Sequence, residues 1–186
     1  PQPPPAETEW VETELVRSMM RTARNAQVAT ALMIPVYVGV LWGDVSTLGL
    51  LLWALAAVLA AGLRTALLRH FAQDVARRPA PAQLQFFRRT AALWPLSGAV
   101  WGATVWLYFD RAPLTNQFIC WLILSGIAMF AVNGLSAQLD GVRAYLNGLL
   151  LTALAFVAWH VVVDLELQGP YYHYWMMALL VIFWQV

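Results

Sequence analysis

Residues 114–135 read LTNQFICWLILSGIAMFAVNGL, a run without a single charged side chain. A helix of that length rises about 33 Å, which matches the roughly 30 Å hydrocarbon core of a bilayer. In the whole chain of 186 residues, 61% of the side chains are apolar and only 11% are charged. An ordinary soluble domain is about half apolar and about a quarter charged. The sequence therefore predicts an all-α integral membrane protein.

The same composition excludes several other classes of protein. Intrinsic disorder requires low hydrophobicity, and a disulfide framework requires several cysteines, whereas this chain has one cysteine. Nucleic-acid binding requires a clustered cationic surface, and the formal net charge is only +1. We therefore expect the chain to lie in the lipid bilayer and to bind no nucleic acid.

Apolar stretches of bilayer-spanning length recur along the whole chain. Their number and the short connections between them predict six transmembrane helices that pair as three helical hairpins. The last six residues, 181–186, are still apolar, so we expect the natural polypeptide to continue beyond Val186. The six stretches are residues 28–42, 48–68, 90–109, 114–135, 144–163 and 171 onward.

Two segments precede the first apolar stretch. Residues 1–5 are rich in proline, which does not propagate a helix, so we expect a disordered leader there. Residues 6–27 carry Glu in the first half and Arg in the second, the order that a helix dipole favours. An apolar strip that includes Val11, Leu15 and Met19 predicts an amphipathic helix at the cytoplasmic membrane surface. This helix is expected to lead into a six-span membrane domain at residues 28–186.

The distribution of arginine sets the expected orientation. The chain has 11 Arg and no Lys, and every Arg except Arg111 falls on one side of the six expected spans. Positively charged loops are retained in the cytoplasm. We therefore expect both the amino terminus and the end of the sixth span to be cytoplasmic.

Two features inside the stretches suggest packing and not chemistry. Arg64 lies about one turn inside the second stretch, and we expect its long side chain to snorkel toward the cytoplasmic side. Ser125, Gly126 and Ala128 form a patch of small residues in the fourth stretch, which predicts close helix packing there.

The titratable residues offer little support for catalysis or active transport. Every Asp and Glu maps to a connection or to the amphipathic helix, which disfavours proton-coupled transport. The three histidines, at positions 70, 160 and 173, are isolated, so the paired spacing of zinc proteases is absent from the sequence. We assign no catalytic residue, metal or cofactor. A copper or haem site at His160 and His173 is the minor alternative.

A candidate ligand pocket is expected in the outer half of the bundle. If the fifth and sixth stretches fold about residue 167, then His160 and His173 lie at nearly the same depth. Folding about residue 140 places Cys120 level with His160. Trp106 lies near the end of the third stretch, on the same side of the membrane. A lipophilic ligand needs apolar walls with a few orienting polar groups, so these four residues are the expected ligand-binding set. A structural, hydrogen-bonded His160 within an interfacial aromatic belt is the alternative.

One part of the chain resembles a known family. The residues concerned are Arg88, Arg89, Trp94, Gly98, Trp101, Gly102, Trp106 and Phe109, followed by ILSGI at 123–127. This pattern, within residues 10–186, resembles the amino-terminal membrane regions of bacterial sensor proteins. In that group, six spans precede a cytoplasmic histidine kinase, often hybrid, or a diguanylate cyclase.

The resemblance implies the input domain of a receptor in the bacterial inner membrane. Such a domain detects a lipophilic or membrane-borne signal and passes it through the sixth span to a cytoplasmic output domain in the same chain. Members generally work as homodimers. No catalytic residue is carried over, because the phosphoacceptor histidine or the cyclase signature would lie beyond Val186. A non-catalytic membrane scaffold, or a small redox subunit, is the alternative that the same composition allows.

Overall fold

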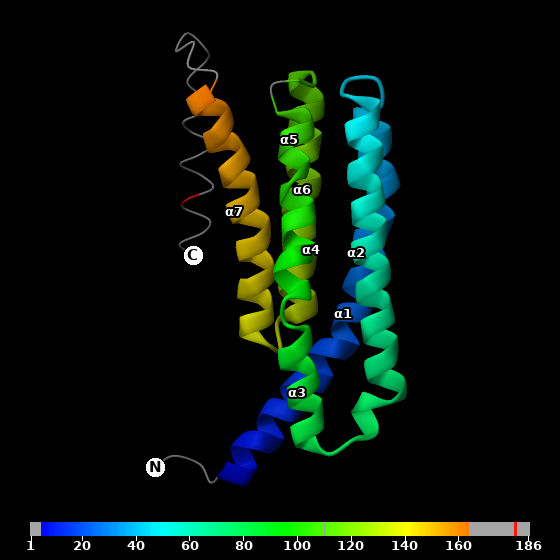
Figure 1. The fold of residues 1–186 in the computed structure, drawn as a ribbon, viewed down its shortest axis with the longest axis vertical. Coiled ribbons are helices and arrows are strands. Elements are labelled where there is room, and N and C mark those ends of the chain that lie inside the picture. The colour runs from blue at the N-terminus through cyan, green and yellow to red at the C-terminus, as the bar shows by residue number, and fades with distance from the viewer. Residues whose placement is uncertain (1–4, 110, 164–180, 182–186) are drawn as a thin grey trace.

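The structure is a computed structural model, and it describes residues 5–109, 111–163 and 181. The regular structure of these residues is entirely helical, which confirms the predicted all-α class (Figure 1). The elements in chain order are α1 (Pro5–Leu41), α2 (Thr47–Gln73), the short 3₁₀ helix η1 (Val75–Arg77), α3 (Ala80–Thr90), α4 (Leu93–Gly102), α5 (Thr104–Tyr108), α6 (Leu114–Leu135) and α7 (Leu139–Val163).

Three segments of the described chain are long and apolar enough to cross a membrane. They are Thr47–Arg77, Leu114–Leu135 and Leu139–His160. Five of the six expected stretches coincide with described helices. These helices are α1, α2, the α4–α5 pair, α6 and α7. The sixth stretch, from residue 171 onward, lies outside the described residues.

The first helix has no boundary between a surface helix and a span. α1 is continuous over 37 residues, so the segment expected as an amphipathic helix runs without interruption into the first expected span. The physical reason is a single buried seam whose members alternate at spacings of three and four residues, which keeps one face of a helix against its neighbours. The seam includes two polar residues at its centre, which makes it hard to see in the sequence. Its members are Val16, Met20, Ala23, Gln27, Thr30, Ile34, Tyr37 and Leu41.

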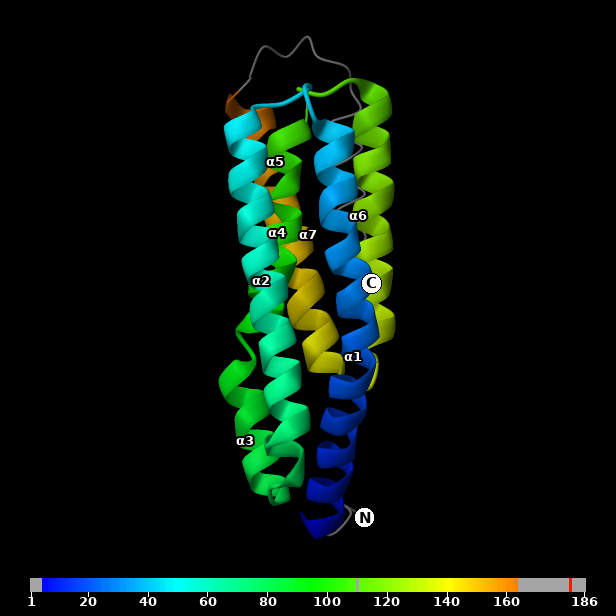
Figure 2. The same ribbon diagram turned by 90° about the vertical axis from the view of Figure 1, so that its right-hand side faces the viewer.

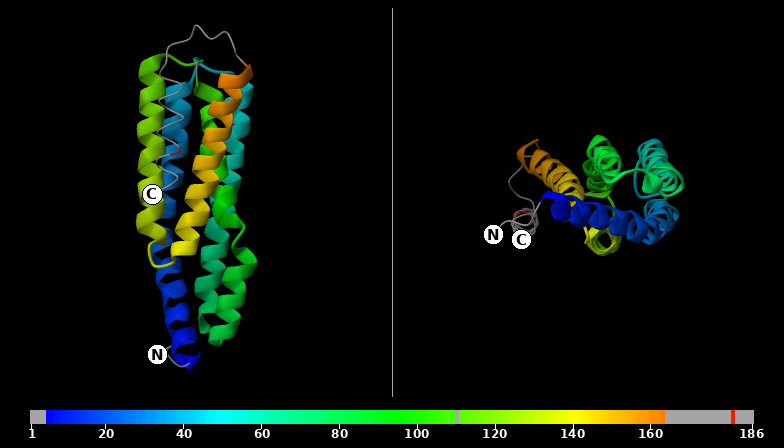
Figure 3. Two further views of the ribbon diagram at one scale, coloured as in Figure 1. Left: turned by 90° about the vertical axis from the view of Figure 1, so that its left-hand side faces the viewer. Right: turned by 90° about the horizontal axis from the view of Figure 1, so that it is seen from below.

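One end of the molecule is built from only part of the bundle. The first half of α1, the end of α2 and the whole of α3 extend beyond the turn that joins α6 to α7 (Figure 3). We call this the arginine-rich end, because ten of the eleven Arg lie toward it and only Arg111 lies toward the other. The opposite end carries the connection 42–46 and the connection after Phe109, and we call it the short-loop end.

A fully buried glutamine joins the elements of the arginine-rich end. The Gln83 side chain donates from Nε2 to the carbonyl oxygens of Ala76 (3.2 Å) and Arg78 (2.7 Å). Its Oε1 accepts from Arg17 Nε of α1 at 2.9 Å. The amphipathic half of α1 thus packs on α3 through its buried side, whereas Val11 and Leu15 of the expected apolar strip stay exposed.

The third expected span is interrupted. Residues 90–109 form the end of α3 and then α4 and α5, which are separated at Ala103. Side chains satisfy carbonyl groups beside this interruption, as an apolar setting requires. The Trp53 indole donates to the Val100 carbonyl at 2.9 Å, and the Thr104 hydroxyl donates to the Trp101 carbonyl at 2.7 Å. The Tyr37 hydroxyl of α1 donates in turn to Thr104 at 3.0 Å.

The closest helix contact is between α4 and α7. Gly98 and Gly102 are four residues apart, so both lie on one face of α4. A Cβ atom added to Gly98 would overlap the Tyr145 carbonyl oxygen, and one added to Gly102 would overlap that of Leu149. From the other side, a Cβ atom on Gly148 of α7 would overlap the Pro95 carbonyl oxygen. We call Gly98, Gly102 and Gly148 the glycine contact.

The small-residue patch expected on the fourth stretch does not form such a contact. A Cβ atom added to Gly126 would meet nothing within 4 Å, and Ser125 is exposed. α6 packs mainly against α1, and α1 lies between α6 and α2 (Figure 2). Small residues allow close approach only where a neighbouring backbone is present, and at Gly126 none is near.

The glycine contact generates a stability prediction. Gly102→Ala should lower the free energy of unfolding by roughly 1–3 kcal/mol, because the new methyl group forces the two backbones apart. Gly126→Ala is the matched control, and it should be neutral or stabilise by up to about 1 kcal/mol through helix propensity. Thermal or denaturant unfolding in detergent measures both. Equal stability of the two variants would contradict the glycine contact.

Candidate functional site

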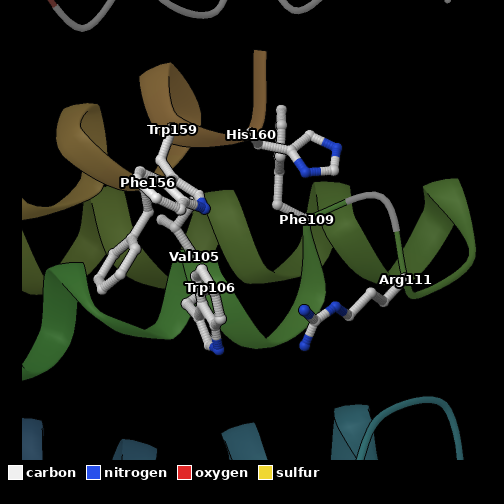
Figure 4. A pocket seen from close by; sticks show the side chains of 7 residues that line it. All are labelled: Val105, Trp106, Phe109, Arg111, Phe156, Trp159 and His160. Carbon is white, nitrogen blue, oxygen red and sulfur yellow. The ribbon is translucent and has the colours of Figure 1, made fainter. Parts of the chain in front are cut away.

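A pocket of about 210 Å³ lies near the short-loop end, between α5 and α7 (Figure 4). α7 contributes three side chains from one face, because positions 156, 159 and 160 follow helical spacing. α5 and the connection after it contribute the facing side chains. The lining residues are Val105, Trp106, Phe109, Arg111, Phe156, Trp159 and His160.

Aromatic rings in contact form the walls of this pocket. The ring centroids of Trp106 and Phe156 are 5.2 Å apart. Phe109 and His160 meet edge to face at 5.4 Å. Arg111 reaches back from the connection, and its Cζ lies 5.2 Å from the centre of the Trp106 ring (Figure 4). The result is an apolar hollow with a cation at its rim.

The structure brings together two of the four residues expected at the site. Trp106 and His160 line the same pocket. Cys120 does not line it, because α6 turns this fully buried side chain toward Tyr37 of α1. His173 lies outside the described residues. Counting residues along the chain predicts a depth, but it says nothing about the direction in which a side chain points.

Several lining residues were missed by the sequence reasoning. Phe156 and Trp159 carry a usable signal, since they share a helix face with His160. Arg111 carries another, since it is the one Arg on its side of the expected spans. Both signals are weak alone, because aromatic belts place the same residue types at the same depth.

A buried cation lies on α2, away from the pocket. Arg64 was expected to snorkel toward the cytoplasmic side, but its side chain is buried, with 5% of the residue exposed. Its Cζ lies 5.1 Å from the Trp94 ring of α4 and 5.4 Å from the Tyr145 ring of α7. We call these three residues the Arg64 junction. A desolvated cation between aromatic rings gains cation–π energy, which offsets part of its burial cost.

The surroundings of the Arg64 junction are also polar. Gln27 of α1 is buried nearby, and its Nε2 donates to the Ala61 carbonyl of α2 at 3.3 Å. Thr30 and Ser97 lie beside the same small hollow, and each hydroxyl donates to a carbonyl of its own helix. Four helices therefore meet at one charged side chain. Such a group is unusual at membrane depth and marks a place where a rearrangement would be costly.

The pocket is suited to binding and offers no evident reaction chemistry. Among the described residues that line it, none is Ser, Thr, Cys, Asp or Glu, so it lacks a nucleophile with a partnered base. In the described part of the chain, His, Cys, Asp and Glu do not gather in groups of three that could hold a metal ion. Aromatic walls with one cation and one imidazole instead fit an amphiphilic ligand.

The Arg64 junction predicts a difference between two conservative substitutions. Arg64→Lys should destabilise the protein by about 1–2 kcal/mol. The compact ammonium group of Lys cannot contact both rings as the broad guanidinium does, and it is more strongly hydrated. Arg69→Lys, five residues later and exposed, should change stability by less than about 0.5 kcal/mol. Unfolding in detergent measures both. An unaltered melting temperature for Arg64→Lys would show that the ring contacts contribute little.

Comparison with known protein families, with curated proteins and with solved structures found no match.

Proposed function

We propose that this chain is the membrane input domain of a bacterial sensor histidine kinase. In this proposal a lipophilic signal enters the pocket between α5 and α7 from the bilayer. Binding alters the position of α7, and the sixth span passes the change to a cytoplasmic output domain in the same chain. The observation that carries the proposal is the pocket itself, with aromatic walls, a polar rim and no catalytic group among its described lining residues.

The proposed arrangement in the membrane has six spans as three hairpins. α1, α2, the α4–α5 pair, α6 and α7 supply five spans, and the chain from residue 171 supplies the sixth. The arginine-rich end faces the cytoplasm of a bacterial cell, and the short-loop end faces outward across the inner membrane. The arginine distribution supports this orientation, and the length and hydropathy of α2, α6 and α7 support the spans.

The glycine contact supports a simple route for the signal. It holds α4 and α7 together below the pocket, whereas α7 diverges from α4 and α5 toward the short-loop end (Figure 1). A ligand wedged between α5 and α7 would therefore tilt α7 about a fixed point. The Arg64 junction adjoins the glycine contact, because the Tyr145 backbone is the part of α7 that Gly98 approaches, so a tilt would shift the ring contacts of the junction. In the chain α7 precedes the sixth stretch, and in a homodimer the two sixth spans would drive the two output domains.

The pocket proposal is tested by removing one lining group. His160→Ala in the full-length protein should abolish the kinase response to a total lipid extract of the host cells while leaving the melting temperature within a few degrees. The reason is that His160 lines the pocket near its surface and is not a core side chain. Trp42→Ala is the control, because Trp42 is an exposed aromatic residue outside the pocket, and it should respond normally. Retention of both stability and full response in His160→Ala would refute the pocket as the sensing site.

The orientation is tested by labelling with an impermeant thiol reagent. In a Cys120→Ser background, Ser46→Cys at the short-loop end should react in intact cells whose outer membrane has been permeabilised. Arg78→Cys at the arginine-rich end should react only after the inner membrane is opened. Both native residues are exposed, so access depends on the side of the membrane alone. Labelling of Arg78→Cys from outside would reverse the proposed topology.

A further inference from the structure

We infer that the pocket selects amphiphiles with an anionic head group, which Arg111 binds at the rim while an acyl chain lies against the aromatic walls. This inference rests on the proposed function, because it names the chemistry of the ligand that the same pocket would take. A carboxylate and a phosphate head group both meet this description, because both present anionic oxygens to Arg111.

The geometry of Arg111 leaves its hydrogen-bond donors in a usable position. The guanidinium contacts the Trp106 ring at 5.2 Å from Cζ, and the residue is exposed. A guanidinium carries five N–H donors in one plane. That planar fork matches the two oxygens of a carboxylate or phosphate. The contact with Trp106 therefore holds an anion-binding group at the rim of the pocket.

The charge at the rim favours an anion. Among the described residues that line the pocket there is no Asp or Glu, while Arg111 and the imidazole of His160 are both present. The ion pairs found in the described part of the chain join Arg17 to Glu14 and His70 to Asp74, and neither pair reaches the pocket. An anionic head group gains a charge-assisted hydrogen bond from Arg111, which a neutral or cationic head group does not.

The size and walls of the pocket favour a chain that continues into the bilayer. About 210 Å³ is below the usual range of small-molecule pockets, roughly 300–1,000 Å³, so it holds a head group and the first part of a chain. Trp106 and Trp159 are 44% and 60% exposed, and they extend the apolar wall outward from the hollow. A compact water-soluble anion would leave these rings uncovered, whereas an amphiphile covers them.

The experiment compares two probes of equal chain length and different head groups. The full chain is placed in nanodiscs of zwitterionic phosphatidylcholine, and binding of labelled dodecanoate and dodecanol is measured above that of empty nanodiscs. We expect dodecanoate to bind at least about tenfold more tightly, since a hydrogen bond between charged groups is stronger than one to a neutral hydroxyl. Arg111→Gln should remove this preference and leave dodecanol binding unchanged. Arg143→Gln, an exposed Arg at the start of α7, is the control and should keep the preference.

A competition arm separates the two sources of the anion. Replacing part of the phosphatidylcholine with phosphatidylglycerol should leave dodecanoate binding intact if the site takes a single-chain acid. It should abolish that binding if the site takes a phospholipid head group. Either result is consistent with an anionic head group, and each assigns its source.

The outcomes that overturn the inference differ from those that overturn the proposed function. Equal saturable binding of acid and alcohol would refute anion selection but leave a lipophilic pocket in place. No protein-dependent binding of either probe would refute the pocket itself. An acid preference that persists in Arg111→Gln would refute the role of Arg111. If Arg111→Gln does not fold, Arg111→Lys, which retains the charge, should keep at least part of the preference, and its complete loss would count against the inference.

Discussion

The close approach of α4 and α7 at the glycine contact is the constraint on which the rest of the bundle depends. Gly98, Gly102 and Gly148 allow backbone to meet backbone, so no other side chain can occupy these positions without moving a helix. In a bilayer the hydrophobic effect does not drive helices together, so close van der Waals contact of this kind is a main source of association. The position of α7, and hence of every residue on it, follows from this contact.

The Arg64 junction and the pocket both use side chains of α7. The Arg64 junction takes its two rings from α4 and α7, so the helix separation set by the glycines also sets the gap that the guanidinium fills. At the other end of α7, Phe156 and His160 face α5 across the pocket, where no glycine holds the helices together. α7 thus carries the glycine contact and the Arg64 junction toward one end and the open pocket toward the other. In such an arrangement, binding at the pocket can displace a distant part of the helix.

The interruption between α4 and α5 fits this division of the molecule. Trp53 and Thr104 satisfy carbonyl groups beside it, so the interruption is stable without exposing unpaired backbone to lipid. It separates the segment that carries the glycine contact from the segment that carries the wall of the pocket. α5 can therefore adjust to a ligand while α4 keeps its contact with α7, which is the property that the proposed sensor needs.

The sequence by itself determined the helical class and the bounds of α6, because bilayer length and hydropathy are local properties. Residues 114–135 form α6 as predicted, and Trp106 and His160, two of the four expected ligand-binding residues, line one pocket. Only the tertiary structure decided which way each helix faces. Cys120 lies against α1 and not in the pocket, and Arg64 is buried and not snorkelled. The depth of a residue along a helix changes by about 1.5 Å per residue, so a small error in counting matters little. The direction of its side chain turns by about 100° per residue, and it depends on which neighbour the helix packs against.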